Sequence, residues 1–154
     1  MNSADERFVR QVIEVSGRAR AKGNPPFGAL LVDDQSNVLL EEENTAATDG
    51  DHTAHPELKV ALVAAQRFDA ESLARYTMYA STEPCAMCTA ALYTAGIGRV
   101  VFALSGATLR ERRGNPPEAL ALSCREVLSH GGRPVEVIGP VAEDDALAHF
   151  GGLL

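Results

Sequence analysis

The segment RVVFALS, residues 99–105, is apolar at nearly every position. A strand with apolar side chains on both faces is typical of a parallel sheet, because helices cover both faces of such a sheet. Parallel neighbours need crossover connections, which are usually helices. The segment therefore predicts a layered α/β fold.

The rest of the chain alternates between strand and helix patterns in the way that such a fold requires. Residues 27–44 predict two strands around a turn at 33–37, which places a hairpin at the start of a mixed sheet. We expect further strands at residues 76–82, 99–105 and 135–141, helices at 5–22, 56–68, 85–96, 118–132 and 142–150, and a loop at 106–117. With no internal repeat or linker, residues 1–154 are expected to form one domain.

Two short motifs lie at the starts of two predicted helices. His55 stands just before one helix, in HPE, and Cys85 opens the next, in PCAMC. Cys88 follows three residues after Cys85, so both sulfurs can point to one side of the first turn. Zinc binds thiolate and neutral imidazole, and a catalytic zinc site takes three protein ligands and keeps the fourth position open. The helix N-terminus also favours the thiolate forms.

Glu57 lies two residues after His55 and is well placed to reach the water that a zinc ion activates. A carboxylate there can accept a proton from the water and return it to a ring nitrogen and a leaving amine. A histidine and glutamate separated by one residue, followed by Pro-Cys-x-x-Cys, form the zinc deaminase signature. The two motifs together favour a catalytic zinc site.

Less specific interpretations exist for each motif taken alone. A Cys-x-x-Cys pair also occurs in redox proteins, but the alanine–methionine interior is not suggestive of thioredoxin. A single histidine before a helix is more often a cap or a surface residue. A structural zinc site is the main alternative. The third cysteine, Cys124, has apolar neighbours at helical spacing and is expected in the core.

Charge and composition limit the partners. The net charge is −7, and the one dense basic run, LRERRG at 109–114, is interrupted by Glu111 and is expected to be a solvated loop. This charge argues against nucleic acid as a partner and favours small uncharged or cationic substrates. Three cysteines argue against a disulfide framework. No run is apolar enough for a membrane span, and the polar N-terminus does not resemble a signal peptide, so a cytoplasmic protein is expected.

Several segments resemble the cytidine deaminase superfamily, above all STEPCAMCTAALYTAGIGRVVFA, together with PPFGALLVD and EEENTAATDGDHTAHPE. The pattern is most similar to the branch that holds guanine deaminase, the fungal-type cytosine deaminase and the tRNA adenosine deaminase. This resemblance implies a three-layer α/β/α sandwich with a mixed five-stranded sheet, and usually a homodimer whose subunits complete each other's pockets. It also implies His55, Cys85 and Cys88 as Zn²⁺ ligands and Glu57 as the proton shuttle.

The resemblance implies roles for three more residues. Asn44 matches an asparagine that hydrogen-bonds the substrate ring, although an asparagine at a strand end is also a common turn residue. Phe27 matches an aromatic residue that lines the pocket of guanine deaminases and is otherwise a core residue. Glu83 matches a glutamate that supports the site from outside the ligand set.

The chain departs from the pattern of this branch in two places. Pro56 replaces the usual alanine or glycine, so no backbone N–H is available there to donate to the substrate. Proline is also favoured at the first position of a helix, which explains the residue equally well. Beyond residue 105, the segment GATLRERRGNPPEAL is basic and proline-rich where guanine deaminases carry acidic residues.

The sequence therefore predicts a zinc-dependent hydrolytic deaminase of a small amino-bearing heterocycle, either a nucleobase or a nucleoside of the guanine or cytosine type. A tRNA-specific adenosine deaminase is the alternative within the enzyme class. A non-catalytic zinc scaffold is the alternative of another class, but folding around zinc does not require Glu57.

Overall fold

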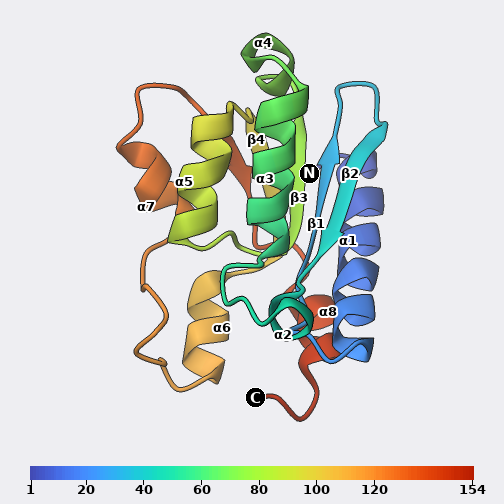
Figure 1. The fold of residues 1–154 in the computed structure, drawn as a ribbon, viewed down its shortest axis with the longest axis vertical. Coiled ribbons are helices and arrows are strands. Elements are labelled where there is room, and N and C mark those ends of the chain that lie inside the picture. Colours follow the sequence, from blue (N-terminus) through green and yellow to red (C-terminus); the bar gives the residue numbers. More distant parts are fainter.

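The computed structural model describes residues 1–154. Its centre is a five-stranded sheet with the strand order β2-β1-β3-β4-β5 (Figure 1). The strands are β1 Gly28–Val32, β2 Val38–Glu43, β3 Thr77–Thr82, β4 Arg99–Leu104 and β5 Glu136–Ile138. Strand β1 is antiparallel to β2 and β3, whereas β3, β4 and β5 run parallel. The sheet is mixed and begins with a hairpin, as the sequence predicts.

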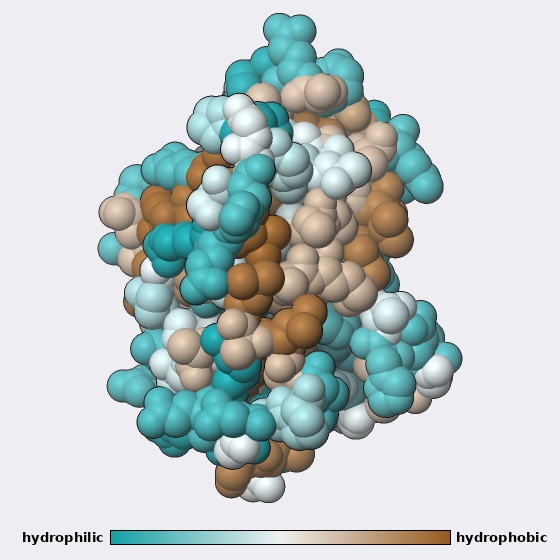
Figure 2. All heavy atoms as spheres, turned by 90° about the vertical axis from the view of Figure 1, so that its left-hand side faces the viewer, coloured by the Kyte–Doolittle hydropathy of each residue, from teal (hydrophilic) through white to brown (hydrophobic).

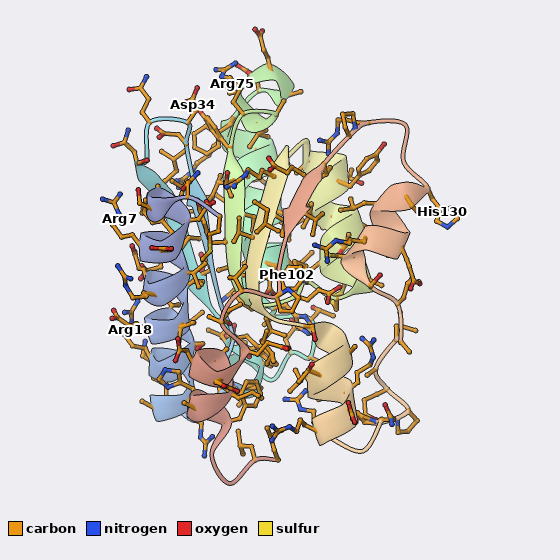
Figure 3. All side chains as sticks on the ribbon, turned by 180° about the vertical axis from the view of Figure 1, so that it is seen from behind. Arg7, Arg18, Asp34, Arg75, Phe102 and His130 are labelled. Atoms are coloured by element: carbon orange, nitrogen blue, oxygen red, sulfur yellow. The ribbon has the colours of Figure 1, made fainter.

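Helices cover both faces of the sheet. One face carries α1 (Ser3–Ala21), α8 (Glu143–Leu147) and the 3₁₀ helix η1 (Ala148–Phe150), and the other carries α3 (Pro56–Arg67), α5 (Ala86–Ala95) and α7 (Cys124–Ser129). Seen from behind, Arg7 and Arg18 project outward from α1, while Phe102 lies in the interior (Figure 3). The predicted three-layer arrangement is therefore confirmed.

Strand β4 explains why the sheet needs both helical layers. Val101 and Ala103 pack into a core cluster with α1, whereas Val100 and Phe102 pack into a second cluster with α3. Alternate residues of a strand point to opposite faces, so an apolar residue at every position must be covered on both sides. The run of apolar residues thus fixes the position of β4 between the two layers.

The region between β4 and α7 differs from the prediction. Residues 106–117 were expected to form a loop, but Gly106–Arg112 form helix α6. Its N-cap is Ser105, whose hydroxyl accepts a hydrogen bond from the Thr108 N–H at 3.1 Å. The stabilisation that Ser105 provides at the N-cap outweighs the unfavourable effect of Gly106 on helix formation.

The predicted helix at 118–132 is also shorter than expected. Only Cys124–Ser129 are helical, because Ser123 caps this helix by accepting a hydrogen bond from the Glu126 N–H. Residues 118–122 instead run in an irregular path before the cap. Two short helices, α2 (Ala46–Asp49) and α4 (Ala70–Leu73), were not predicted, since four residues carry no usable periodicity. None of the helices has the length and apolarity needed to cross a membrane.

Candidate active site and metal centre

Three potential metal ligands meet where α3 and α5 begin. His55 is the N-cap of α3, Cys85 is the N-cap of α5, and Cys88 lies in the first turn of α5. The Nδ1 atom of His55 is 3.7 Å from Sγ of Cys85 and 3.5 Å from Sγ of Cys88. All three donor atoms lie within 4.8 Å of one another. Residues 30 positions apart in the sequence thus form one compact cluster.

The spacing of this cluster suits zinc. With zinc–sulfur distances of about 2.3 Å and zinc–nitrogen distances of about 2.0 Å, neighbouring ligands of a tetrahedral ion lie roughly 3.5 Å apart. The measured separations of 3.5 and 3.7 Å match that edge length. One imidazole and two thiolates leave a fourth position free, which is the arrangement of catalytic zinc sites.

The two thiols are electrostatically different. The pKa of Cys85 is lowered to about 4, first because the Cys88 side chain hydrogen-bonds its sulfur, and also because His55 does. The pKa of Cys88 is raised by this hydrogen bond with Cys85 and by burial. A thiolate is therefore already favoured at the start of α5, which prepares the cluster to bind a cation.

Glu57 is a buried carboxyl group beside this cluster. Its exposed fraction is 5%, and it lines the same cavity as His55 and Cys85. Burial raises the pKa of Glu57 to about 8, and the nearby His55 opposes this effect in part. A group with this pKa can hold or release a proton near neutral pH, as a proton shuttle must.

A cavity of about 880 Å³ opens at the ends of β3 and β4. Residues that line it include Phe27, Asn44, His52, His55, Glu57, Thr82, Glu83, Cys85, Met87, Arg110, Arg113, Glu118, Leu120 and Leu122. Open α/β sheets place a ligand crevice at the carboxyl ends of their strands, beside the N-termini of the following helices, and the cavity lies at this edge of the sheet. Figure 2 views the side of the molecule that carries α6 and α7, where apolar atoms gather in the middle of the face.

Asn44 has a fixed orientation within the cavity wall. Its Oδ1 atom accepts a hydrogen bond from the Ala46 N–H at 2.8 Å. The residue is buried and lines the cavity, and the bond to Ala46 is the one hydrogen bond that its side chain forms within the protein. Because the acceptor end is used and the donor end is free, Asn44 can donate hydrogen bonds to an acceptor on a ligand.

Phe27 combines the two roles that the sequence left open. It lines the cavity, and its ring packs edge-on against Phe150 with centroids 5.7 Å apart. The backbone carbonyl of Phe27 also accepts a hydrogen bond from the Asn44 N–H at 3.0 Å. The aromatic wall and the amide donor are therefore held together at one side of the cavity.

Glu83 connects the metal cluster to the opposite wall. Its Oε1 atom accepts from the Gly106 N–H at 2.9 Å, and its Oε2 atom accepts from the Cys124 N–H at 2.8 Å. These two amides mark the start of α6 and the start of α7. One carboxylate, two residues before Cys85, thus holds both ends of residues 106–124.

The structure places Pro56 differently from the other predicted residues. It occupies the first helical position of α3 and is buried, but it is absent from the residues that line the cavity. The helix-start explanation accounts for this position, and contact with a substrate at Pro56 stays a prediction.

Sequence reasoning missed the contribution of the segment between α6 and α7. Nine of the 21 lining residues come from Gly106 to Leu122, including Arg110 and Arg113. The sequence predicts a solvated loop for the basic run LRERRG at 109–114. Its sequence carries no signal for the cavity, because Glu83 brings the segment there through a long-range contact.

Comparison with known proteins identifies the family. The model of the cytidine and deoxycytidylate deaminase zinc-binding region matches residues 2–104. The chain is 38% identical over 151 residues to a probable cytosine deaminase of Schizosaccharomyces pombe, covering 96% of this chain and 90% of that protein. It is 37% identical over 101 residues to a tRNA-specific adenosine deaminase of Haemophilus influenzae, covering 66% of this chain and 58% of that protein.

The fold agrees with this assignment. A solved guanine deaminase from Nitrosomonas europaea superposes with a TM-score of 0.75 at 20% identity, covering 92% of this chain and 79% of that one. The family model spans His55, Cys85 and Cys88, so the zinc ion predicted from the sequence agrees with both the family and the donor cluster. The chain belongs to the cytidine and deoxycytidylate deaminase zinc-binding family.

Proposed function

We propose that the protein removes the amino group of a small heterocycle by hydrolysis, with zinc held by His55, Cys85 and Cys88 and with Glu57 as the proton shuttle. The family already makes the chain a zinc-dependent hydrolase that acts on C–N bonds of cyclic amidines. The observation that carries the finer proposal is Glu57, a buried carboxyl group that lines the cavity beside the donor cluster.

The chemistry divides between the metal and the protein. Zinc in such a site supplies Lewis acidity, which lowers the pKa of water from 15.7 to about 7. Glu57 then accepts a proton from the attacking water and delivers it to the ring nitrogen. A second proton passes through Glu57 to the amino group, which leaves as ammonia, and the amino-bearing carbon becomes a carbonyl.

Two cavity residues orient the ring for this attack. Asn44 offers a fixed amide donor, which suits a ring nitrogen or carbonyl oxygen on the substrate. Phe27 provides an apolar wall beside it, which excludes water from that side of the ring. An aminated ring with an acceptor next to the reacting carbon satisfies both contacts.

Cytosine is the first substrate to test, and guanine is the second. The 38% identity to a probable cytosine deaminase extends over 96% of this chain, which supports a cytosine-type ring. Adenosine in tRNA is the second candidate function, favoured by the 37% identity to a tRNA-specific adenosine deaminase. The net charge of −7 speaks against an extended RNA contact. The proposal keeps the homodimer that the family resemblance implies, which sedimentation can test.

The experiment is ammonia release from zinc-loaded protein with cytosine, cytidine, guanine, guanosine, adenine, adenosine and a tRNA anticodon hairpin. We expect turnover of a small ring or its nucleoside, with cytosine among the best. Turnover of the hairpin alone would contradict the small-substrate proposal and support the second candidate. No release from any of them, with zinc bound, would contradict the turnover of an uncharged nucleobase or nucleoside.

A further inference from the structure

The cavity is larger than one heterocyclic ring requires. Its volume is about 880 Å³, and the metal cluster, Glu57 and Asn44 occupy the side formed by α3, α5 and the end of β2. The other side consists of residues from Gly106 to Leu122. The cavity therefore has room for a group beyond the reacting ring.

Two cationic side chains line that other side. Arg110 lies in α6, and Arg113 is the residue that ends this helix. Neither guanidinium takes part in any of the six ion pairs of the structure, and neither side chain donates a hydrogen bond within the protein. Both cations are therefore available to a ligand.

Arg113 is held in place without being neutralised. Its guanidinium carbon lies 5.6 Å from the ring centroids of both Phe27 and Phe150, which is within the range of cation–π attraction. Partial burial lowers the pKa of Arg113, and the charge of Glu118 offsets part of this effect. Attraction to two rings limits the motion of the side chain while leaving its N–H groups free.

The acidic residues of the cavity do not cancel these charges by contact. Both carboxylate oxygens of Glu83 already accept hydrogen bonds from backbone N–H groups. Glu118 lines the cavity but forms no ion pair with Arg110 or Arg113. Two arginines on one wall present forked donors that match the oxygens of a carboxylate or a phosphate.

We propose that Arg110 and Arg113 form a subsite for an anionic substituent, a carboxylate or a phosphate, on the heterocycle that the enzyme deaminates. The inference rests on the proposed function for the identity of the reacting ring. It revises the expectation from the net charge, since a local pair of cations outweighs the charge of the whole chain at close range. Among the heterocycles that the enzyme accepts, the subsite therefore favours those that bear an acidic group.

The test measures binding to zinc-loaded protein by calorimetry with two matched pairs of probes. One pair is cytidine and cytidine 5′-monophosphate, and the other is cytosine and 5-carboxycytosine. We expect the anionic member of at least one pair to bind at least tenfold more tightly than its neutral partner, with a preference that weakens as salt rises. The pair that shows the preference identifies the source of the charge.

Variants assign the preference to the two arginines. The double variant Arg110→Gln/Arg113→Gln should abolish the preference for the anionic probe. The control variant Arg112→Gln should retain this preference, because Arg112 is exposed on the same helix and does not line the cavity. Arg113→Lys keeps the charge and should retain part of the preference. Equal affinity within both pairs, no binding of either anionic probe at millimolar concentration, or equal loss in Arg112→Gln would overturn the subsite.

Ammonia release separates this inference from the proposed function. Turnover of cytosine without any preference for anionic probes would overturn the subsite and leave the deaminase proposal intact. An arginine-dependent preference in a protein that releases no ammonia from any probe would support the subsite and remove the proposed activity.

Discussion

At the scale of single residues, Asn44 provides a specific test of substrate orientation. Its Oδ1 atom is held by the Ala46 N–H, so only the Nδ2 donor is free. Asn44→Asp keeps the acceptor that holds the turn and removes the donor. We expect normal folding and a fall in kcat/KM of about two- to tenfold, since a hydrogen bond of this kind contributes about 0.5–1.5 kcal/mol.

Steady-state kinetics on the preferred ring checks this prediction. A thermal unfolding scan of Asn44→Asp, compared with the unmodified chain, confirms that the turn at Ala46 is kept. Unchanged kcat/KM with unchanged stability would show that Asn44 does not contact the substrate.

The residues of the metal cluster were the easiest to predict from the sequence. The cluster consists of one histidine and two cysteines, which are uncommon residue types. Pro56 follows His55 at the start of one helix, and Cys85 and Cys88 have the spacing Cys-x-x-Cys at the start of another. Asn44 was predicted from the family resemblance alone, and only the structure reveals which end of its amide is free. Short motifs report chemistry well, but they do not report the orientation of a side chain.

At the scale of elements, Glu83 joins three parts of the cavity wall. Its carboxylate holds the starts of α6 and α7 and stands two residues from Cys85. Glu83→Gln replaces one acceptor with an amide donor, which cannot pair with a backbone N–H. We expect residues 106–124 to loosen, with KM rising several-fold while zinc content and kcat change less.

The hydrogen-exchange rates of the Gly106 and Cys124 amides measure this loosening directly. Glu126→Gln is the matched control, because Glu126 is exposed on α7 and its side chain forms no hydrogen bond or ion pair. Protected Gly106 and Cys124 amides in Glu83→Gln, or a change confined to overall stability, would contradict a positioning role for Glu83.

The elements were predicted unevenly, and Glu83 explains part of the difference. Strand β4 and helices α3 and α5 follow from local apolar patterns and helix-start signals, so they agree with the sequence. Residues 106–123 contain glycine and two prolines, and their path depends on a carboxylate that is more than 20 residues away. Long-range contacts of this type are not visible in a local pattern.

At the scale of the whole molecule, an ion pair between a buried aspartate and a partly buried arginine connects the first helix to the sheet. Asp5 of α1 has an exposed fraction of 0%, and its two carboxylate oxygens accept from Arg99 of β4 at 2.7 and 2.8 Å. The Tyr79 hydroxyl donates to the same carboxylate at 2.6 Å. The hydrogen bond from Arg99, despite the opposing effect of burial, holds the pKa of Asp5 well below its usual value.

This lowered pKa predicts an acid-sensitive stability. A carboxylate with a depressed pKa in the folded state stabilises the fold above its unfolded pKa of about 4, and this contribution is lost as the pH falls towards the folded value. Asp5→Asn should lower the free energy of unfolding by about 3 kcal/mol at pH 7, because Arg99 loses its partner. The difference between the variant and the unmodified chain should shrink below pH 4.

Urea unfolding at several pH values measures this difference. Asp34→Asn is the control, since Asp34 forms an exposed ion pair with Arg75 and should change stability by less than about 1 kcal/mol (Figure 3). A gap between Asp5→Asn and the unmodified chain that stays constant from neutral to acidic pH would rule out the ionised Asp5 as its cause.

The central claim is that Glu57 moves protons at a zinc ion held by His55, Cys85 and Cys88. The most direct test measures ammonia release and zinc content of the Glu57→Gln variant. The control is Glu71→Gln, which changes an exposed glutamate of α4. We predict one zinc per chain in both, a loss of activity of about a thousandfold in Glu57→Gln, and unchanged activity in Glu71→Gln. Full activity of Glu57→Gln with zinc bound would contradict the account.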